Sequence, residues 1–328
     1  MKNILSIVDK PPFTYLLYPA YRTSILMTHQ KTTDWFLSSF VQFSCNKKEL
    51  NDFGIEFETI PFLKEKDIVF RKDSPKEAIF RIINYIDDGK YISLTWDESL
   101  VACRPHYSNE HYKHMVMIFG YDLNHGSFEI IGFSEQNIYE KRTISFEDFS
   151  IAYSFFSDSR WKVFSWKKRK NRGFNLNHFN KLLLCYRKSY FPLLYRLAFS
   201  QSFLKNKCFG FETYNCLTLR LSKEKEEGKA SMAALKALTA YCEHKNHLVM
   251  SFKLIKNLNL ISEDKMVKII EEYEIILKEW IIIRNIYLKY YNTMLPHYID
   301  RIIDKINLIT SKEKRTIDNY LKNIKSTF

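Results

Sequence analysis

The sequence predicts an α+β protein, with an antiparallel sheet in the N-terminal domain and an all-helical bundle after it. Apolar residues fall in short, strand-length runs in the first half and at a 3.6-residue spacing in the second. The chain has 328 residues, which suits two domains. A basic segment, residues 167–173, separates the two patterns. We therefore expect domains at 1–166 and 174–328, joined by a basic linker.

A helix start signal stands in the middle of the first half. Ser74 is a suitable N-cap, Pro75 occupies the first helical position, and Glu77 completes a capping box. Gly89 ends the expected helix. The strands expected on either side of this helix cover residues 35–44 and 91–96.

A β-hairpin is predicted further along. His114 opens an apolar strand at 114–122, Asn124 to Gly126 form a turn, and the partner strand covers 127–133. Another helix begins near Ser145, and the last strand of the domain is expected at 161–166.

The second half predicts five helices with apolar faces, which indicates an antiparallel bundle with short loops. Ser262 is a suitable N-cap for the fourth helix. The expected helices cover residues 176–189, 212–222, 229–255, 263–291 and 296–322, the last with a break near Ser311. Their long apolar faces also suit a homodimer.

The cysteines and the hydropathy exclude several classes of protein. None of the six cysteines has Cys-x-x-Cys spacing and no histidine cluster accompanies them, so we expect free thiols and no bound metal. No apolar run is long enough to span a membrane and no secretory signal is visible. These features predict a soluble cytoplasmic protein without a membrane partner.

The net charge of +13 suits nucleic acid, an anionic membrane or an acidic protein as partner. The dense basic cluster consists of Lys167, Lys168, Arg169, Lys170 and Arg172. No helix-turn-helix, zinc finger or aromatic RNA-binding signature accompanies it. Nucleic-acid binding is therefore kept as an alternative and is not the main expectation.

His114 is the first candidate for chemistry. A histidine at the mouth of a buried strand can be held rigidly while its ring faces a cleft, where it could act as a general base. The alternative is an ordinary surface histidine that precedes a strand.

The segment from His114 through Gly120, Tyr121 and Asp122 resembles the histidine strand of papain-like folds. It is most similar to the N-terminal domain family of the butirosin biosynthesis protein H, a cysteine-peptidase-like family. The order of elements from Phe13 to Trp166 is similar as well. The C-terminal half resembles that of members found beside nonribosomal peptide synthetase genes.

This resemblance implies acyl transfer in natural product biosynthesis. Family members use a Cys-His-Asp arrangement to take an aminoacyl or peptidyl group from the phosphopantetheine thioester of a carrier protein. They pass this group to an amine and form an amide. The implied partners are an acidic carrier protein, which the basic cluster could bind, and an amine substrate; no cofactor is bound directly.

The nucleophile departs from the family pattern. The stretch 19–27, where the family has its cysteine, contains none, and Thr23 and Ser24 are the hydroxyls of that stretch. Cys45 and Cys103 stand elsewhere in the first half and are the alternative nucleophiles. An accessory protein that binds a carrier protein or synthetase without catalysis is therefore the second hypothesis.

The auxiliary residues are also assigned by resemblance. Glu135 is the acid nearest to the place from which relatives orient the histidine. Gln42 could supply an amide to an oxyanion hole, and Asp122 follows the histidine strand.

Overall fold

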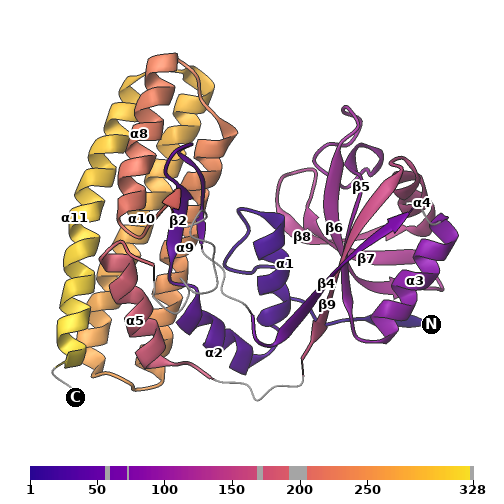
Figure 1. Ribbon diagram of the computed structural model, residues 1–328, viewed down its shortest axis with the longest axis horizontal. Helices are drawn as coiled ribbons and strands as arrows, with labels where there is room; N and C mark the ends of the chain where they lie inside the picture. Colours follow the sequence, from indigo (N-terminus) through magenta and orange to yellow (C-terminus); the bar gives the residue numbers. More distant parts are fainter. Residues whose placement is uncertain (56–59, 72–73, 168–172, 192–204, 326–328) are drawn as a thin grey trace. The chain divides into compact units, whose positions relative to one another are not determined.

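The computed structural model describes residues 1–55, 60–71, 74–167, 173–191 and 205–325. It is mixed α+β, with antiparallel sheets and a helical C-terminal region, which confirms the predicted class. The chain forms two compact units (Figure 1). The first unit comprises Met1–Thr33 and Thr59–Asn171, and the second comprises Asp34–Glu58 and Arg172–Phe328.

The first unit contains a seven-stranded sheet whose neighbouring strands are antiparallel. The predicted hairpin is present, with Tyr121 opposite Phe128. Along the sheet the order is β4 (Leu63–Arg71), β9 (Asp158–Trp166), β5 (Tyr91–Asp97), β6 (Lys113–Asp122), β7 (Ser127–Phe133) and β8 (Tyr139–Ser145), and β1 (Lys2–Ile4) pairs with the end of β6.

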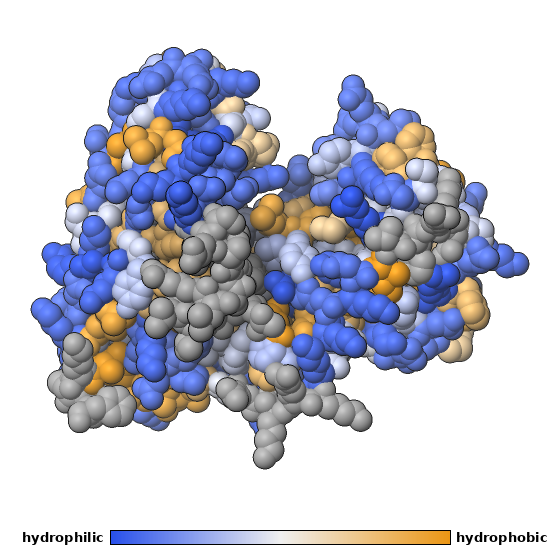
Figure 2. Space-filling model, viewed as in Figure 1, coloured by the Kyte–Doolittle hydropathy of each residue, from blue (hydrophilic) through white to orange (hydrophobic). Residues whose placement is uncertain are grey.

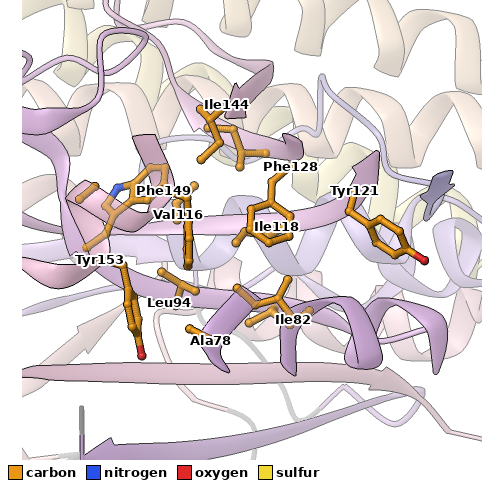
Figure 3. Packing of buried hydrophobic residues seen from close by; sticks show 14 of the residues in the cluster. Ala78, Ile82, Leu94, Val116, Ile118, Tyr121, Phe128, Ile144, Phe149 and Tyr153 are labelled. Carbon is orange, nitrogen blue, oxygen red and sulfur yellow. The ribbon is translucent and has the colours of Figure 1, made fainter. Parts of the chain in front are cut away.

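Helices α3 (Pro75–Asp87) and α4 (Phe146–Ser154) cover one face of this sheet. The helix α3 begins at the predicted capping box, in which the Glu77 amide donates to Ser74 Oγ at 3.3 Å. Figure 3 shows the buried cluster between helices and sheet, to which α3 contributes Ile82, α4 contributes Phe149 and β6 contributes Val116 and Ile118.

Helix α1 (Leu17–Leu26) packs against the opposite face. The Tyr18 ring contacts Phe164 of β9, and the Tyr21 hydroxyl donates to the backbone oxygen of Met115 in β6 at 3.1 Å. Side chains alternate along a strand, so Phe164 points away from the cluster that contains Trp161. The sheet therefore lies between α1 and the pair α3 and α4.

The second unit is built from long helices. Helix α10 packs against both α9 and α11, and short loops connect the three helices in sequence. This is the predicted antiparallel arrangement. The described helices that lie wholly in this unit are α5 (Leu176–Arg187), α8 (Glu212–Glu227), α9 (Met232–Asn257), α10 (Glu263–Thr293) and α11 (His297–Lys325).

The predicted break near Ser311 is wrong, because α11 is continuous there. The Ser311 hydroxyl donates to the backbone oxygen of Asn307 at 3.3 Å, within the helix. Ile309 and Ile317 are both buried, so the apolar face runs through this position without interruption.

Residues 34–58 cluster with the helices and not with the rest of residues 1–166, in contrast to the predicted boundary. The reason is a small sheet in which β2 (Phe43–Asn46) pairs with β3 (Asn51–Ile55) and β10 (Lys207–Phe209). The expected strand at 35–44 is wrong, since α2 covers Gln30–Ser39.

A glycine fixes the turn between β10 and α8. Gly210 has φ +54°, and a Cβ there would overlap the backbone oxygen of Tyr186. We expect Gly210→Ala to lower the free energy of unfolding by more than about 1–2 kcal/mol, the cost of a left-handed residue alone. Thermal unfolding measures this, with Gly173→Ala as control because a Cβ there meets no atom within 4 Å. Equal stability of the two variants would contradict the assigned turn.

Candidate functional site

The first unit holds His114 at the start of β6, beside the end of β5. Trp96 of β5 pairs directly with His114 across the sheet, and the short 3₁₀ helix η1 (Glu98–Leu100) begins immediately after β5. This places Glu98 against the histidine, with 3.0 Å between His114 Nδ1 and Glu98 Oε2. The two residues form a histidine–carboxylate pair.

Arg104 holds the other oxygen of the same carboxylate. Its Nε lies 2.7 Å and its Nη2 lies 2.5 Å from Glu98 Oε1, so two guanidinium nitrogens contact the same carboxylate oxygen. The Glu98 side chain is fully buried and that of Arg104 is 2% exposed. Gly132 of β7 leaves room for the guanidinium, since a Cβ there would overlap Arg104 Nη1.

The carboxylate of Glu98 is held in its ionised form. Burial raises its pKa, but the hydrogen bond with His114 and the charge of Arg104 outweigh burial, so the pKa is lowered from its ordinary value. An ionised carboxylate can only accept at His114 Nδ1, and this fixes the tautomer of a neutral imidazole with the proton on Nδ1. Nε2 is then left as the basic nitrogen of a side chain that is 29% exposed.

Asp97 bonds to both ends of the segment 99–112, which connects β5 to β6. It accepts hydrogen bonds from the Ser99 and Tyr112 amides at 3.1 and 3.0 Å, and it contacts His111 Nδ1 at 2.6 Å. Burial raises its pKa, but bonds from Ser99, Tyr112 and His111 outweigh that effect and lower it. The loop that carries Arg104 is thus tied to the sheet.

Two further rings lie around His114. The Tyr112 and His106 ring centroids are 5.2 and 6.4 Å from that of His114, and they are 4.0 Å from each other. Tyr112 is 43% exposed, so this rim reaches solvent. A rim of this kind can contact an apolar or planar ligand.

The predicted hydroxyl nucleophiles of α1 are buried and already bonded. Thr23 donates to the backbone oxygen of Pro19 within the helix at 2.9 Å, and Ser24 Oγ lies 3.1 Å from the Tyr139 hydroxyl. In the part of the chain that the structure describes, His114 hydrogen-bonds to Glu98 and to no thiol or hydroxyl.

The two predicted cysteine nucleophiles belong to different units. Cys103 packs against the hydrophobic cluster under α3 and α4, and burial raises the pKa of its thiol. Cys45 belongs to the second unit, where its sulfur lies 3.0 Å from that of Cys208. Gln42 belongs to the second unit as well, and its amide donates to the backbone oxygen of Leu182 at 2.6 Å.

The predicted acids also lie elsewhere. Glu135 pairs with Arg142 at 3.3 Å, and neither side chain is deeply buried. Asp122 is at the opposite end of β6 from His114 and contacts His125 Nδ1 at 3.0 Å. The structure therefore brings Glu98, and not Glu135 or Asp122, to the histidine.

The basic cluster is described only in part. The Lys167 amide donates to the backbone oxygen of Phe62 at 2.8 Å, which continues the pairing of β9 with β4. Lys168, Arg169, Lys170 and Arg172 lie outside the described residues.

Sequence reasoning missed Glu98 and Arg104. The signal available for Glu98 was its place directly after a strand that could pair with the histidine strand, which puts an acid and a histidine at the same sheet end. Nothing in the sequence marked Arg104.

Comparison with protein-family models and with curated proteins found no match. Among the described residues, every helix is too short or too polar to cross a membrane. On the face seen in Figure 2, hydrophilic residues dominate and apolar residues form separate patches.

Proposed function

We propose that the first unit is a papain-like acyl-transfer domain that moves an acyl or aminoacyl group from a carrier-protein thioester to an amine. The resemblance of the histidine strand to the butirosin family supports the fold and the substrate class. The observation that carries the chemistry is the 3.0 Å contact of His114 with the buried, arginine-held Glu98. A carboxylate that orients and stabilises an imidazole is the usual support of a histidine general base.

The reaction proceeds by direct attack. Neutral His114 Nε2 accepts a proton from the amine while the amine nitrogen attacks the thioester carbonyl. The C–N bond forms and the C–S bond breaks, and the imidazolium returns the proton to the departing phosphopantetheine thiolate. Glu98 stabilises the imidazolium between the two proton transfers. No covalent enzyme intermediate is required, in keeping with the internal bonds of Thr23 and Ser24.

An accessory carrier-binding role is the second candidate. The observation in its favour is that His114 is bonded to no thiol or hydroxyl within the described residues. The two roles differ in whether amide product forms.

The test is intact-mass analysis of the protein mixed with aminoacyl-loaded carrier proteins and a panel of amines. We expect amide product with the wild-type chain and its loss with His114→Ala, since the base is removed. His125→Ala is the matched control, because His125 lies on the hairpin turn at the other end of β6 with an 80% exposed side chain. Carrier binding without product would replace the proposal by the accessory role. Product that survives in His114→Ala would remove His114 from the mechanism.

A further inference from the structure

Three cysteines from three elements of the second unit meet in its interior. Cys45 lies on β2, Cys208 on β10 and Cys216 on α8. Their sulfurs are 3.0 Å apart for Cys45 and Cys208 and 3.2 Å apart for Cys208 and Cys216, and all three lie within 4.8 Å of one another. We call this group the cysteine cluster.

The fold brings these residues together although Cys45 is remote in sequence from the other two. Antiparallel pairing of β10 with β2 sets Cys208 opposite Cys45. The turn at Gly210 then leads directly into α8, which carries Cys216 and contacts both strands. Each of the three side chains is buried. The positions are thus fixed by backbone pairing and not by flexible side chains.

The spacing of the sulfurs differs from ordinary packing. Non-bonded carbon atoms pack best at about 3.5–4.0 Å, and sulfur is a larger atom, so contacts of 3.0 and 3.2 Å are close. Thiols are weak hydrogen-bond donors and gain little from one another. Three thiolates around a zinc ion would stand about 3.8 Å apart in tetrahedral geometry, given a Zn–S distance of about 2.3 Å. A sub-ångström expansion of the cluster would therefore admit the metal.

The charges nearby suit a bound cation with thiolate ligands. Lys47 follows β2 and pairs with Glu212, the first residue of α8, at 3.1 Å. Three thiolates and a divalent cation carry one net negative charge, which the Lys47 ammonium can offset.

We propose that Cys45, Cys208 and Cys216 bind one zinc ion in the second unit, with water in the fourth position. No motif in the sequence marks this site, since Cys208 lies 163 positions after Cys45. The donor set of soft sulfur ligands selects zinc over magnesium or calcium. The site is independent of the chemistry proposed for His114.

Zinc content and cobalt spectroscopy test the site on the full chain. We expect about one zinc per chain after purification without chelators, and a Co²⁺-substituted protein with intense thiolate-to-cobalt charge-transfer absorption. Alanine at Cys45, Cys208 or Cys216 should weaken Zn²⁺ binding by at least about 100-fold in competition with a chromophoric chelator, more than the roughly 10–100-fold typical of outer-shell changes. Cys242→Ala is the matched control, as Cys242 is a buried thiol of α9 outside the cluster.

The cobalt spectrum needs only the wild-type chain, so the test stands even if a variant fails to fold. A spectrum without thiolate charge transfer would overturn the proposal. Undiminished zinc binding by Cys208→Ala would overturn it too. A Cys45–Cys208 disulfide found by mass analysis of protein that binds no zinc would replace it by a redox pair.

Discussion

Glu313→Gln is expected to lower the free energy of unfolding of the second unit by about 3–5 kcal/mol, because it leaves a buried ammonium without its counter-ion. Glu313 of α11 and Lys245 of α9 are both fully buried, with 2.8 Å between Lys245 Nζ and Glu313 Oε1. The hydroxyls of Tyr186, Tyr214 and Tyr273 also donate to this carboxylate, so its oxygens serve several partners. Burial lowers the pKa of Lys245, while the charge and the hydrogen bond of Glu313 act in the opposite direction and favour the ammonium.

Chemical denaturation of the single variants Glu313→Gln and Lys245→Met and of the double variant Lys245→Met/Glu313→Gln measures this effect. The matched control is Glu274→Gln, whose partner Lys253 is 53% exposed. Exposed ion pairs contribute at most about 1 kcal/mol, so the control should stay close to wild type. If Glu313→Gln were no less stable than Glu274→Gln, the buried pair of Lys245 and Glu313 would make no special contribution to the free energy of unfolding. A double variant more stable than Glu313→Gln would identify the lone ammonium as the cause of the loss.

Glu98→Gln is expected to lower amide formation by about 10²–10⁴-fold, the range of general-base catalysis, because a neutral amide at this position cannot stabilise the imidazolium of His114. Glutamine has nearly the shape of glutamate, but it leaves the Arg104 guanidinium, which is 2% exposed, without an anion. We therefore also expect a loss of stability, and turnover must be compared at a temperature where circular dichroism shows both proteins folded.

Glu135→Gln is the discriminating comparison for this prediction. It removes the acid that the family resemblance suggests, which pairs with Arg142 instead. We expect unchanged turnover for Glu135→Gln and a large loss for Glu98→Gln. The reverse order would show that the hairpin acid, and not the acid after β5, orients the histidine.

The buried carboxylate of Glu98 gives the first unit a defined dependence on pH. The pKa of Glu98 is lower in the folded chain than its ordinary value of about 4.3, so folding favours the ionised form. Its contribution to stability is therefore complete above that ordinary value, and it falls as the pH drops through the folded pKa. Acid unfolding of Glu98→Gln should lack this component.

Local signals in the sequence predicted the local parts of the fold. The Ser74 capping box and the turn at Asn124 to Gly126 depend on residues within four positions, and both are present. The segment 35–44 was misread as a strand because it is rich in aromatic and other apolar residues, although buried Phe36 and Phe40 stand at helical spacing.

The sites depend on pairing between distant segments, which one sequence does not specify. Glu98 meets His114 because β5 pairs with β6 in one particular register. Cys45 meets Cys208 through the pairing of β2 with β10, and β10 has only three residues, Lys207–Phe209. A strand so short leaves almost no pattern in the sequence, so the cysteine cluster could not be foreseen.

The division of the chain into interleaved units has a consequence for its synthesis. Strand β2 leaves the ribosome early, but its partner β10 follows only after the entire remainder of the first unit has been made. The edge of β2 that pairs with β10 therefore stays unpaired until β10 has been made. Contacts between segments so far apart in sequence form slowly. The small sheet of the helical unit therefore cannot be completed before β10 has been made. A fragment that begins at the basic linker would lack two of the three strands of its small sheet.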